Sequence, residues 1–324
     1  MTSVKRLRLQ FYYATAVLFH APFLLLCGEW TERSATTPSF LIFGTVFLLL
    51  VLVGRWDITG YYLRPTLLLT FFIICFHKGG GRALVAAIGC LLSLWFLLSR
   101  PRAKPTAVIE LSFPLRHGWY CVAHGGSIVV LNQHRRFPVK SQQYALDIVR
   151  LNARGFRSRG VYPSDPKAYA IFHDVVYSPC EGVITSIVND QPDLSPGDMD
   201  PGQGAGNYII IRCANTGTFV GLVHLAQGSI GVRPGDVVTI GQPLAQVGNS
   251  GNTSEPHLHI HAKRGGRPDS MLDGEGIAIR FDGEWLIRNS VVRTAARNQH
   301  AFIRRVSTLR AISPERPAGW PGRS

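Results

Sequence analysis

The sequence predicts two regions of different fold class, an α-helical membrane region at the amino end and a mainly β domain after it. The first hundred of the 324 residues are far more apolar than the rest and contain several long apolar runs with few charges. From Ala107 onward, short β-branched runs alternate with Gly, Pro, Asp and Asn, the pattern of an antiparallel sandwich or barrel. We therefore predict a membrane region (1–100), a linker (101–111), a β domain (112–290) and a basic, disordered tail (291–324).

Four apolar runs are the candidate membrane helices. They are Phe11–Cys27, Phe40–Val53, Leu67–Phe76 and Ala83–Leu98. Several are shorter than the ~20 residues that span a bilayer comfortably, but flanking aromatic residues such as Trp56 would lengthen them at the interface. Four successive runs with so few charges favour membrane helices over buried helices of a soluble domain.

The number of spans stays open between three and four. The basic amino end, Met1–Gln10, favours a cytoplasmic N-terminus. Four spans would return the chain to the cytoplasm, in agreement with the basic residues after the last run. Three spans would place the remainder outside, for example if Leu67–Phe76 is re-entrant.

Charge and cysteine content limit the classes of partner and of cross-link. The net charge of +14 favours anionic partners such as lipid headgroups or wall polymers, and no nucleic-acid motif is present. Beyond the apolar runs the cysteines are Cys121, Cys180 and Cys213, an odd number without C-x-x-C spacing. Neither a zinc knuckle nor a disulfide framework is indicated, while one disulfide among them stays open.

Within the β domain, nine runs are predicted to be strands. They are Val122–Val130, Ala145–Val149, Val175–Tyr177, Gly182–Val188, Tyr208–Cys213, Thr218–His224, Asp236–Ile240, Leu244–Val247 and Leu258–Ala262. The polar connection Asp190–Gly206 separates the fourth run from the fifth. Its acidic residues do not follow the spacing of an EF-hand loop, so we predict a surface loop.

The most informative stretch is Gly248–His261, which reads G-N-S-G-N-T-S-E-P-H-L-H-I-H. Side chains alternate along a strand, so the imidazoles of His257, His259 and His261 are expected on one face. Imidazole is the commonest protein metal ligand and also moves protons near neutral pH. The spacing therefore favours a site in which one ring holds a metal and another works on bound water.

The chain resembles the lysostaphin-type zinc metallopeptidases, the LytM-like murein endopeptidases. The matching motifs are Q-Y-A-L-D (Gln143–Asp147), L-V-H-L (Leu222–Leu225) and P-H-L-H-I-H (Pro256–His261), linked by S-P-C-E-G-V-I, G-N-Y-I-I-I and V-R-P-G-D-V-V-T-I-G-Q-P-L-A-Q-V-G-N-S-G. They follow one another in the family's order and cover about residues 112–281. The resemblance implies the lysostaphin-type β fold and a Zn²⁺ cofactor.

The resemblance also implies a role for individual residues. Asp147 and His259 would be zinc ligands, which are oxygen and nitrogen donors of the kinds zinc prefers. His224 and His257 would flank the bound water, one accepting its proton and the other stabilising the oxyanion or protonating the leaving amine. Which of the two does which stays open.

Two positions depart from the family pattern. Gln143 stands where the family has its first zinc histidine, and a neutral amide is a poor zinc ligand. The replacement we predict is His134, in the sequence N-Q-H nine positions earlier. His261 replaces the family's usual glutamate and is left without a role.

The predicted function is that of a membrane-anchored zinc endopeptidase that hydrolyses peptide cross-bridges of peptidoglycan. The apolar runs predict a multi-pass protein of the bacterial cytoplasmic membrane. The substrate implied by the resemblance places the β domain on the side of the periplasm or cell wall, with lipid and wall peptide as partners. One alternative is a degenerate relative that binds wall peptides or regulates a wall hydrolase, for which Gln143 is the argument. A second is a membrane scaffold whose β domain only docks a partner.

Overall fold

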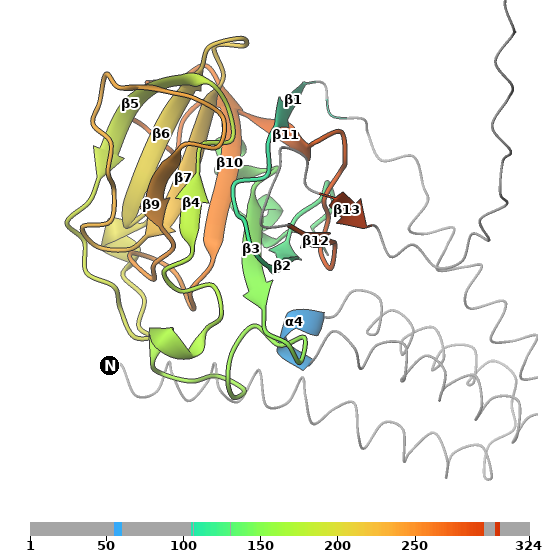
Figure 1. Ribbon diagram of the computed structural model, residues 1–324. Helices are drawn as coiled ribbons and strands as arrows, with labels where there is room; N and C mark the ends of the chain where they lie inside the picture. Colours follow the sequence, from blue (N-terminus) through green and yellow to red (C-terminus); the bar gives the residue numbers. More distant parts are fainter. Residues whose placement is uncertain (1–54, 60–104, 106, 130, 295–301, 305–324) are drawn as a thin grey trace, which may run out of the picture.

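The computed structural model describes residues 55–59, 105, 107–129, 131–294 and 302–304. The four predicted membrane runs and most of the basic tail lie outside the described residues. Within these ranges, no helix is long and apolar enough to cross a membrane. The described part is a mainly β domain with one short helix, α4 (Trp56–Thr59), beside it (Figure 1).

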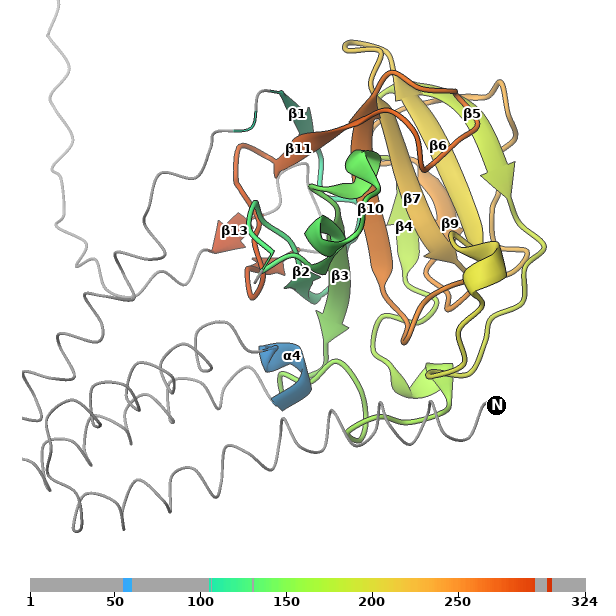
Figure 2. The same cartoon turned by 180° about the vertical axis from the view of Figure 1, so that it is seen from behind.

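A large sheet dominates the domain, as both views show (Figures 1 and 2). Its strands follow the order β13-β12-β2-β3-β10-β7-β6-β5-β8, while β11 pairs with β10 and β1 pairs with β11. They are β1 (Val108–Leu111), β2 (Trp119–His124), β3 (Leu146–Leu151), β5 (Gly182–Val188), β6 (Asn207–Cys213), β7 (Phe219–Leu225), β8 (Val237–Val238), β10 (Leu258–Arg264), β11 (Glu275–Phe281), β12 (Val291–Arg293) and β13 (Phe302–Arg304). All neighbours except β1 and β11 run antiparallel.

A small second sheet, β4 (Val175–Tyr177) paired with β9 (Pro243–Gln246), completes the core. Val176 and Leu244 from this sheet join the same buried cluster as Ile184 of β5 and Leu222 of β7. Removing these β-branched and aliphatic side chains from water is the main driving force that holds the two sheets together. The mainly β, antiparallel character predicted from the sequence is confirmed.

The strand β10 lies at the centre of the large sheet and sets the geometry of the candidate site. Its first half pairs with β3, its second half with β11, and its other edge with β7. The register places His259 opposite Asp147 on one side and opposite Val223 on the other. The polar residues singled out in three separate motifs therefore meet on neighbouring strands.

The boundaries of the domain are wider than the sequence indicated. The strand β1 lies inside the predicted linker 101–111, where its pairing with β11 makes it part of the domain. Ile109 and Leu111 are buried while their neighbours are exposed, an alternation too short to stand out in the sequence. The predicted strand Val122–Val130 is also shifted, because the chain turns at Gly125 and Gly126.

The predicted disordered tail 291–324 likewise contains structure. The strand β12 pairs with β2, and β13 pairs with β12. Val291 and Val292 are buried, and the guanidinium of Arg293 lies 5.3 Å from the ring centroid of Trp119. Because the surrounding sequence is rich in arginine, these two buried valines were not recognised as part of a strand.

One disulfide, Cys180–Cys213, joins the chain ahead of β5 to the end of β6. The antiparallel pairing of these strands places Gly182 opposite Cys213, which brings the two cysteines within reach of each other. The sequence left one disulfide open and did not select this pair.

Candidate metal centre

The centre of the site is the pair Asp147 and His259, which the register places opposite each other. His259 Nδ1 lies 3.0 Å from Asp147 Oδ1. Both side chains are buried. A carboxylate and an imidazole on two paired central strands cannot move apart without breaking the sheet, so the pair is rigidly placed.

The third donor of this group is His134, from a short 3-10 turn, η1 (Gln133–Arg136). Its Nε2 lies 3.0 Å from the other carboxylate oxygen, Asp147 Oδ2. Asn132 holds the turn in place: its side-chain oxygen accepts a hydrogen bond from the His134 backbone N–H, and its amide donates to the carbonyls of Gln143 and Ala145. The N-x-H sequence is thus a buried cap that aims His134 at Asp147.

Gln143 is not among the groups of side chains positioned to hold a metal in the described structure. It follows the 3-10 turn η2 (Lys140–Gln142), and its backbone carbonyl accepts from Asn132. His134, nine positions earlier, lies beside Asp147 instead.

A second pair of histidines, His224 and His257, lies on the other side of His259. Their ring centroids are 5.0 Å apart, and that of His224 is 5.9 Å from that of His259. His224 Nδ1 contacts the Ser250 carbonyl at 2.9 Å, and His257 Nδ1 contacts the Glu255 carbonyl at 2.8 Å. Because each Nδ1–H donates to a carbonyl, each Nε2 is left to face the site.

His261, which the sequence left without a role, completes a chain of hydrogen bonds behind His259. His259 Nε2 lies 3.2 Å from His261 Nδ1, and the His261 ring donates to the backbone carbonyl of Met271. In the tautomer of His259 that donates from Nε2 to His261, the lone pair of Nδ1 faces Asp147 Oδ1 at 3.0 Å, and a bound cation would satisfy both acceptors.

These donors fit a zinc ion. One nitrogen or oxygen atom from each of His134, Asp147 and His259 lies within 4.8 Å of the other two. His134 Nε2 is 3.0 Å from one Asp147 carboxylate oxygen, and His259 Nδ1 is 3.0 Å from the other. Two imidazoles and a carboxylate are also a donor set that zinc favours. His224, His257 and His259 form a second group within the same distance limit, but it contains no carboxylate.

The geometry can now be compared with known proteins. Residues 169–270 match the family model of peptidase family M23. Over this segment, the match confirms the resemblance predicted from the sequence. The matched M23 segment includes His224, His257 and His259, while His134 and Asp147 precede it.

Solved structures of similar fold include three peptidases. A zinc-containing peptidase from Vibrio cholerae is 21% identical, with 49% of this chain and 37% of that chain covered and a TM-score of 0.29. Lysostaphin from Staphylococcus simulans is 18% identical, with 48% and 47% covered and a TM-score of 0.29. An M23 peptidase from Pseudomonas aeruginosa is 17% identical, with 54% of each chain covered and a TM-score of 0.27. This chain thus spans 37% to 54% of their lengths, and scores this low carry no functional argument.

Burial and neighbouring charges set the protonation of the candidate site. Burial alone would raise the pKa of Asp147, but His134 and His257 hold it well below its usual value. Burial lowers the pKa of His259 to about 4 and keeps that of His224 well below its usual range. At neutral pH these two rings are uncharged, as a zinc ligand or a proton acceptor must be. The pKa of His257 is raised, because the nearby Asp147 carboxylate outweighs burial.

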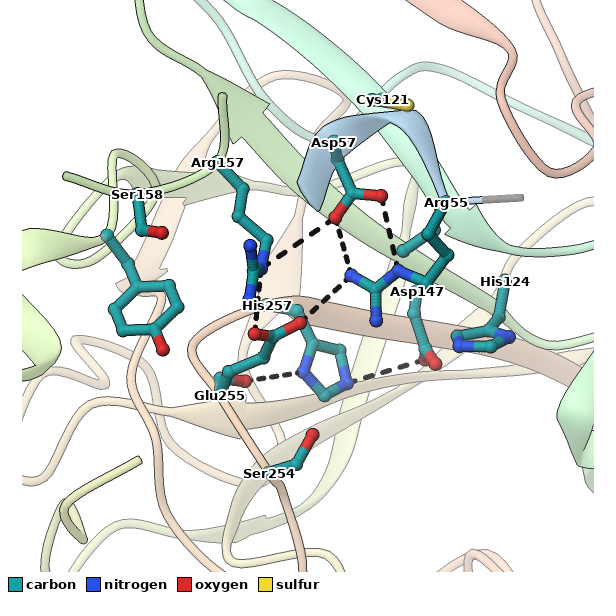
Figure 3. A network of polar contacts seen from close by, with 12 residues as sticks. Arg55, Asp57, Cys121, His124, Asp147, Arg157, Ser158, Ser254, Glu255 and His257 are labelled. Carbon is teal, nitrogen blue, oxygen red and sulfur yellow. Dashed lines mark hydrogen bonds and ion pairs between the residues drawn. The ribbon is translucent and has the colours of Figure 1, made fainter. Parts of the chain in front are cut away.

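Sequence reasoning missed a charged network at the edge of this site (Figure 3). Arg55, which precedes α4, and Asp57 of α4 meet Arg157 and Glu255 of the β domain. Arg55 and Asp57 lie between two predicted membrane runs, and nothing in their local sequence indicates a contact with residues 100 to 200 positions away. The sequence showed Glu255, two residues before His257, only as part of the glycine-rich stretch Gly248–His261, with no sign of its ion pairs.

The other histidines of the domain differ in their distance from these donors. His117 and His173 are exposed. His124 lies opposite Asp147 in the β2–β3 register, its ring centroid is 6.5 Å from that of His134, and its Nδ1 contacts Arg288 at 2.6 Å. Within the polar connection Asp190–Gly206, the Asp193 carboxylate accepts from the backbone N–H groups of Gln227 and Asn249. The connection is thus fastened to the domain, with one 3-10 turn, η4 (Pro201–Gln203).

Proposed function

We propose that this protein is a membrane-anchored zinc endopeptidase that hydrolyses peptide cross-bridges of peptidoglycan. The observation that carries the proposal is the convergence of His134, Asp147 and His259 on one point, with His224 and His257 beside it. The M23 match over residues 169–270 supports hydrolysis of a peptide bond as the reaction.

Each side chain has a chemical task in this proposal. His134, Asp147 and His259 would hold zinc, which when bound supplies a Lewis acid and a nucleophilic water at neutral pH. His224 and His257 present Nε2 to the site, where one accepts a proton from water and the other donates one to the leaving amine. Their Nδ1–H bonds to the carbonyls of Ser250 and Glu255 fix the ring orientation that this requires.

Two features support a site outside the cytoplasm. The disulfide Cys180–Cys213 is of a kind that persists in oxidising compartments such as the periplasm or cell surface. The net charge of +14 favours anionic lipid and wall polymers. We therefore propose that the chain is a multi-pass protein of the bacterial cytoplasmic membrane whose β domain faces the cell wall.

The rival function is that of a degenerate, binding-only relative, for which Gln143 is the argument. This argument is weakened because His134 supplies the missing nitrogen donor, 3.0 Å from Asp147. A binding-only protein also has no need for two further imidazoles oriented by carbonyl groups.

The test is digestion of purified peptidoglycan by the full-length protein in detergent, followed by chromatography of the products and counting of new amino groups. Wild type and His173→Ala, which changes an exposed histidine, should release cross-bridge fragments. His224→Ala should reduce release by about 100-fold or more, the range for loss of a general acid or base. A zinc-loaded wild type that releases no fragments would establish the binding-only alternative.

A further inference from the structure

Four charged side chains form a closed ion-pair network between α4 and the β domain. Arg55 Nη2 lies 2.5 Å from Asp57 Oδ2 and 2.9 Å from Glu255 Oε1. Arg157 Nε lies 2.7 Å from Glu255 Oε2 and 3.9 Å from Asp57 Oδ2. The Arg157 backbone N–H also donates to the Asp57 carbonyl at 2.9 Å. Figure 3 shows the two carboxylates between the two guanidinium groups.

The network is buried and balanced in charge. Asp57, Arg157 and Glu255 are at most 2% exposed, and the Arg55 side chain is 16% exposed. Two cations face two anions, so no net charge is left in the interior. Removing one member of such a buried set is costly because its partner then stays buried without compensation. Arg55 and Asp57 therefore determine whether Glu255 can keep its place.

Glu255 connects this network to the candidate site. Its backbone carbonyl accepts from His257 Nδ1 at 2.8 Å, and only Pro256, which restricts the backbone, separates the two residues. The same His257 ring places Nε2 3.4 Å from Asp147 Oδ1. A shift of the Glu255 backbone would therefore turn the His257 ring away from the site.

We propose that Arg55 is a positioning residue of the active site, through which α4 fixes the backbone of Glu255 and hence the orientation of His257. This inference rests on the proposed function, because it assigns the network to the same hydrolytic site. It also means that the segment between the predicted runs Phe40–Val53 and Leu67–Phe76 completes the peptidase domain. Truncation at the predicted linker would leave Glu255 and Arg157 without Arg55 and Asp57.

The experiment compares zinc content, kcat, KM and melting temperature of the full-length protein in detergent, with a defined cross-bridge peptide as substrate. The variants are Arg55→Ala and Arg55→Lys. The control is Arg280→Ala, which removes a partly exposed arginine of β11 that is paired with Glu110 of β1. Because the ion pairs of Arg55 are made with Asp57 and Glu255, which are not proposed zinc ligands, Arg55→Ala should keep one zinc per chain.

We expect kcat of Arg55→Ala to fall roughly 10- to 100-fold, the size of effect that a misplaced catalytic group produces, with a smaller change in KM. Arg55→Lys, which keeps the charge but not the two-pronged contact, should be intermediate. Arg280→Ala should match wild type. If Arg55→Ala also lowers the melting temperature, the kcat of Arg55→Lys decides whether Arg55 is a positioning residue, provided that Arg55→Lys melts at the same temperature as wild type.

Two outcomes would separate the claims. An active wild type in which the Arg55 variants keep the kcat of Arg280→Ala would overturn the positioning role alone. A wild type that neither binds zinc nor cleaves the peptide would overturn the proposed function itself.

Discussion

At the scale of single residues, the candidate site is a group of three donors that lie within 4.8 Å of one another. The H-x-H spacing placed His257 and His259 on one face because strand geometry is regular, and Asp147 followed from its motif. His134 was inferred as a replacement for Gln143, and the structure places it at hydrogen-bonding distance from Asp147. His261 could not be assigned, because its task depends on Met271, a residue of a different segment.

The hydrogen-bond chain through His261 leads to a prediction about metal affinity. His261→Ala removes the acceptor for His259 Nε2–H, so zinc affinity should fall about 10- to 100-fold, as for other partners that orient metal ligands. His261→Glu should keep most of the affinity, because a carboxylate also accepts this hydrogen bond. Competition with a zinc-binding dye measures both. If wild type, His261→Ala and the surface control His117→Ala bind zinc with equal affinity, the hydrogen bond from His259 to His261 does not support the metal centre.

At the scale of elements, some strands were predicted with the correct bounds, such as β4 and β5. The missed strands are β1, β12 and β13, of three or four residues each, and β11, of seven residues. The three short strands carry too little periodicity to be recognised locally. The helix α4 was missed as part of the domain because the contact of the adjacent Arg55 is made 200 positions away.

Gly206, the last residue of the connection 190–206 before β6, allows a prediction about the position of His224. Gly206 has a φ of 59°, and a Cβ at this position would overlap the Ser250 carbonyl that accepts from His224. Gly206→Ala should therefore displace Ser250 and lower kcat by at least 10-fold, while zinc remains bound to residues of other strands. Measurements of kcat and zinc content test this.

Gly217→Ala is the matched control. Gly217 has a similar φ of 66°, but the space around its Cβ position is open. It therefore shares the backbone strain of a left-handed alanine without the overlap. If both variants lose activity equally, backbone strain rather than the Ser250 contact is responsible.

At the scale of the whole molecule, the contact between Arg55 and Glu255 constrains membrane topology. Both residues must lie on the same side of any membrane, so we predict that the chain crosses it an even number of times, or not at all, between Thr59 and residue 107. The sequence could not reveal this, because apolar length alone does not fix the path of a chain.

Reporter fusions test the even number of spans. Alkaline phosphatase, which is active only outside the cytoplasm, fused after Thr59 and after Thr294 should give the same result at both positions. With the proposed orientation both fusions should be active, and fluorescent-protein fusions at the same positions should be dark after export through the general secretory route. Opposite results at the two positions would contradict the docking of α4 on the domain.

The most direct measurement of the central claim is the zinc content of the purified full-length protein and two variants, determined by mass spectrometry after removal of loosely bound metal. Wild type and Gln143→Ala should each carry one zinc per chain, because Gln143 is outside the donor group. His134→Ala should carry little, because catalytic zinc sites normally need three protein ligands. Full zinc in His134→Ala, or none in wild type, would contradict the assignment of His134, Asp147 and His259 as the metal centre.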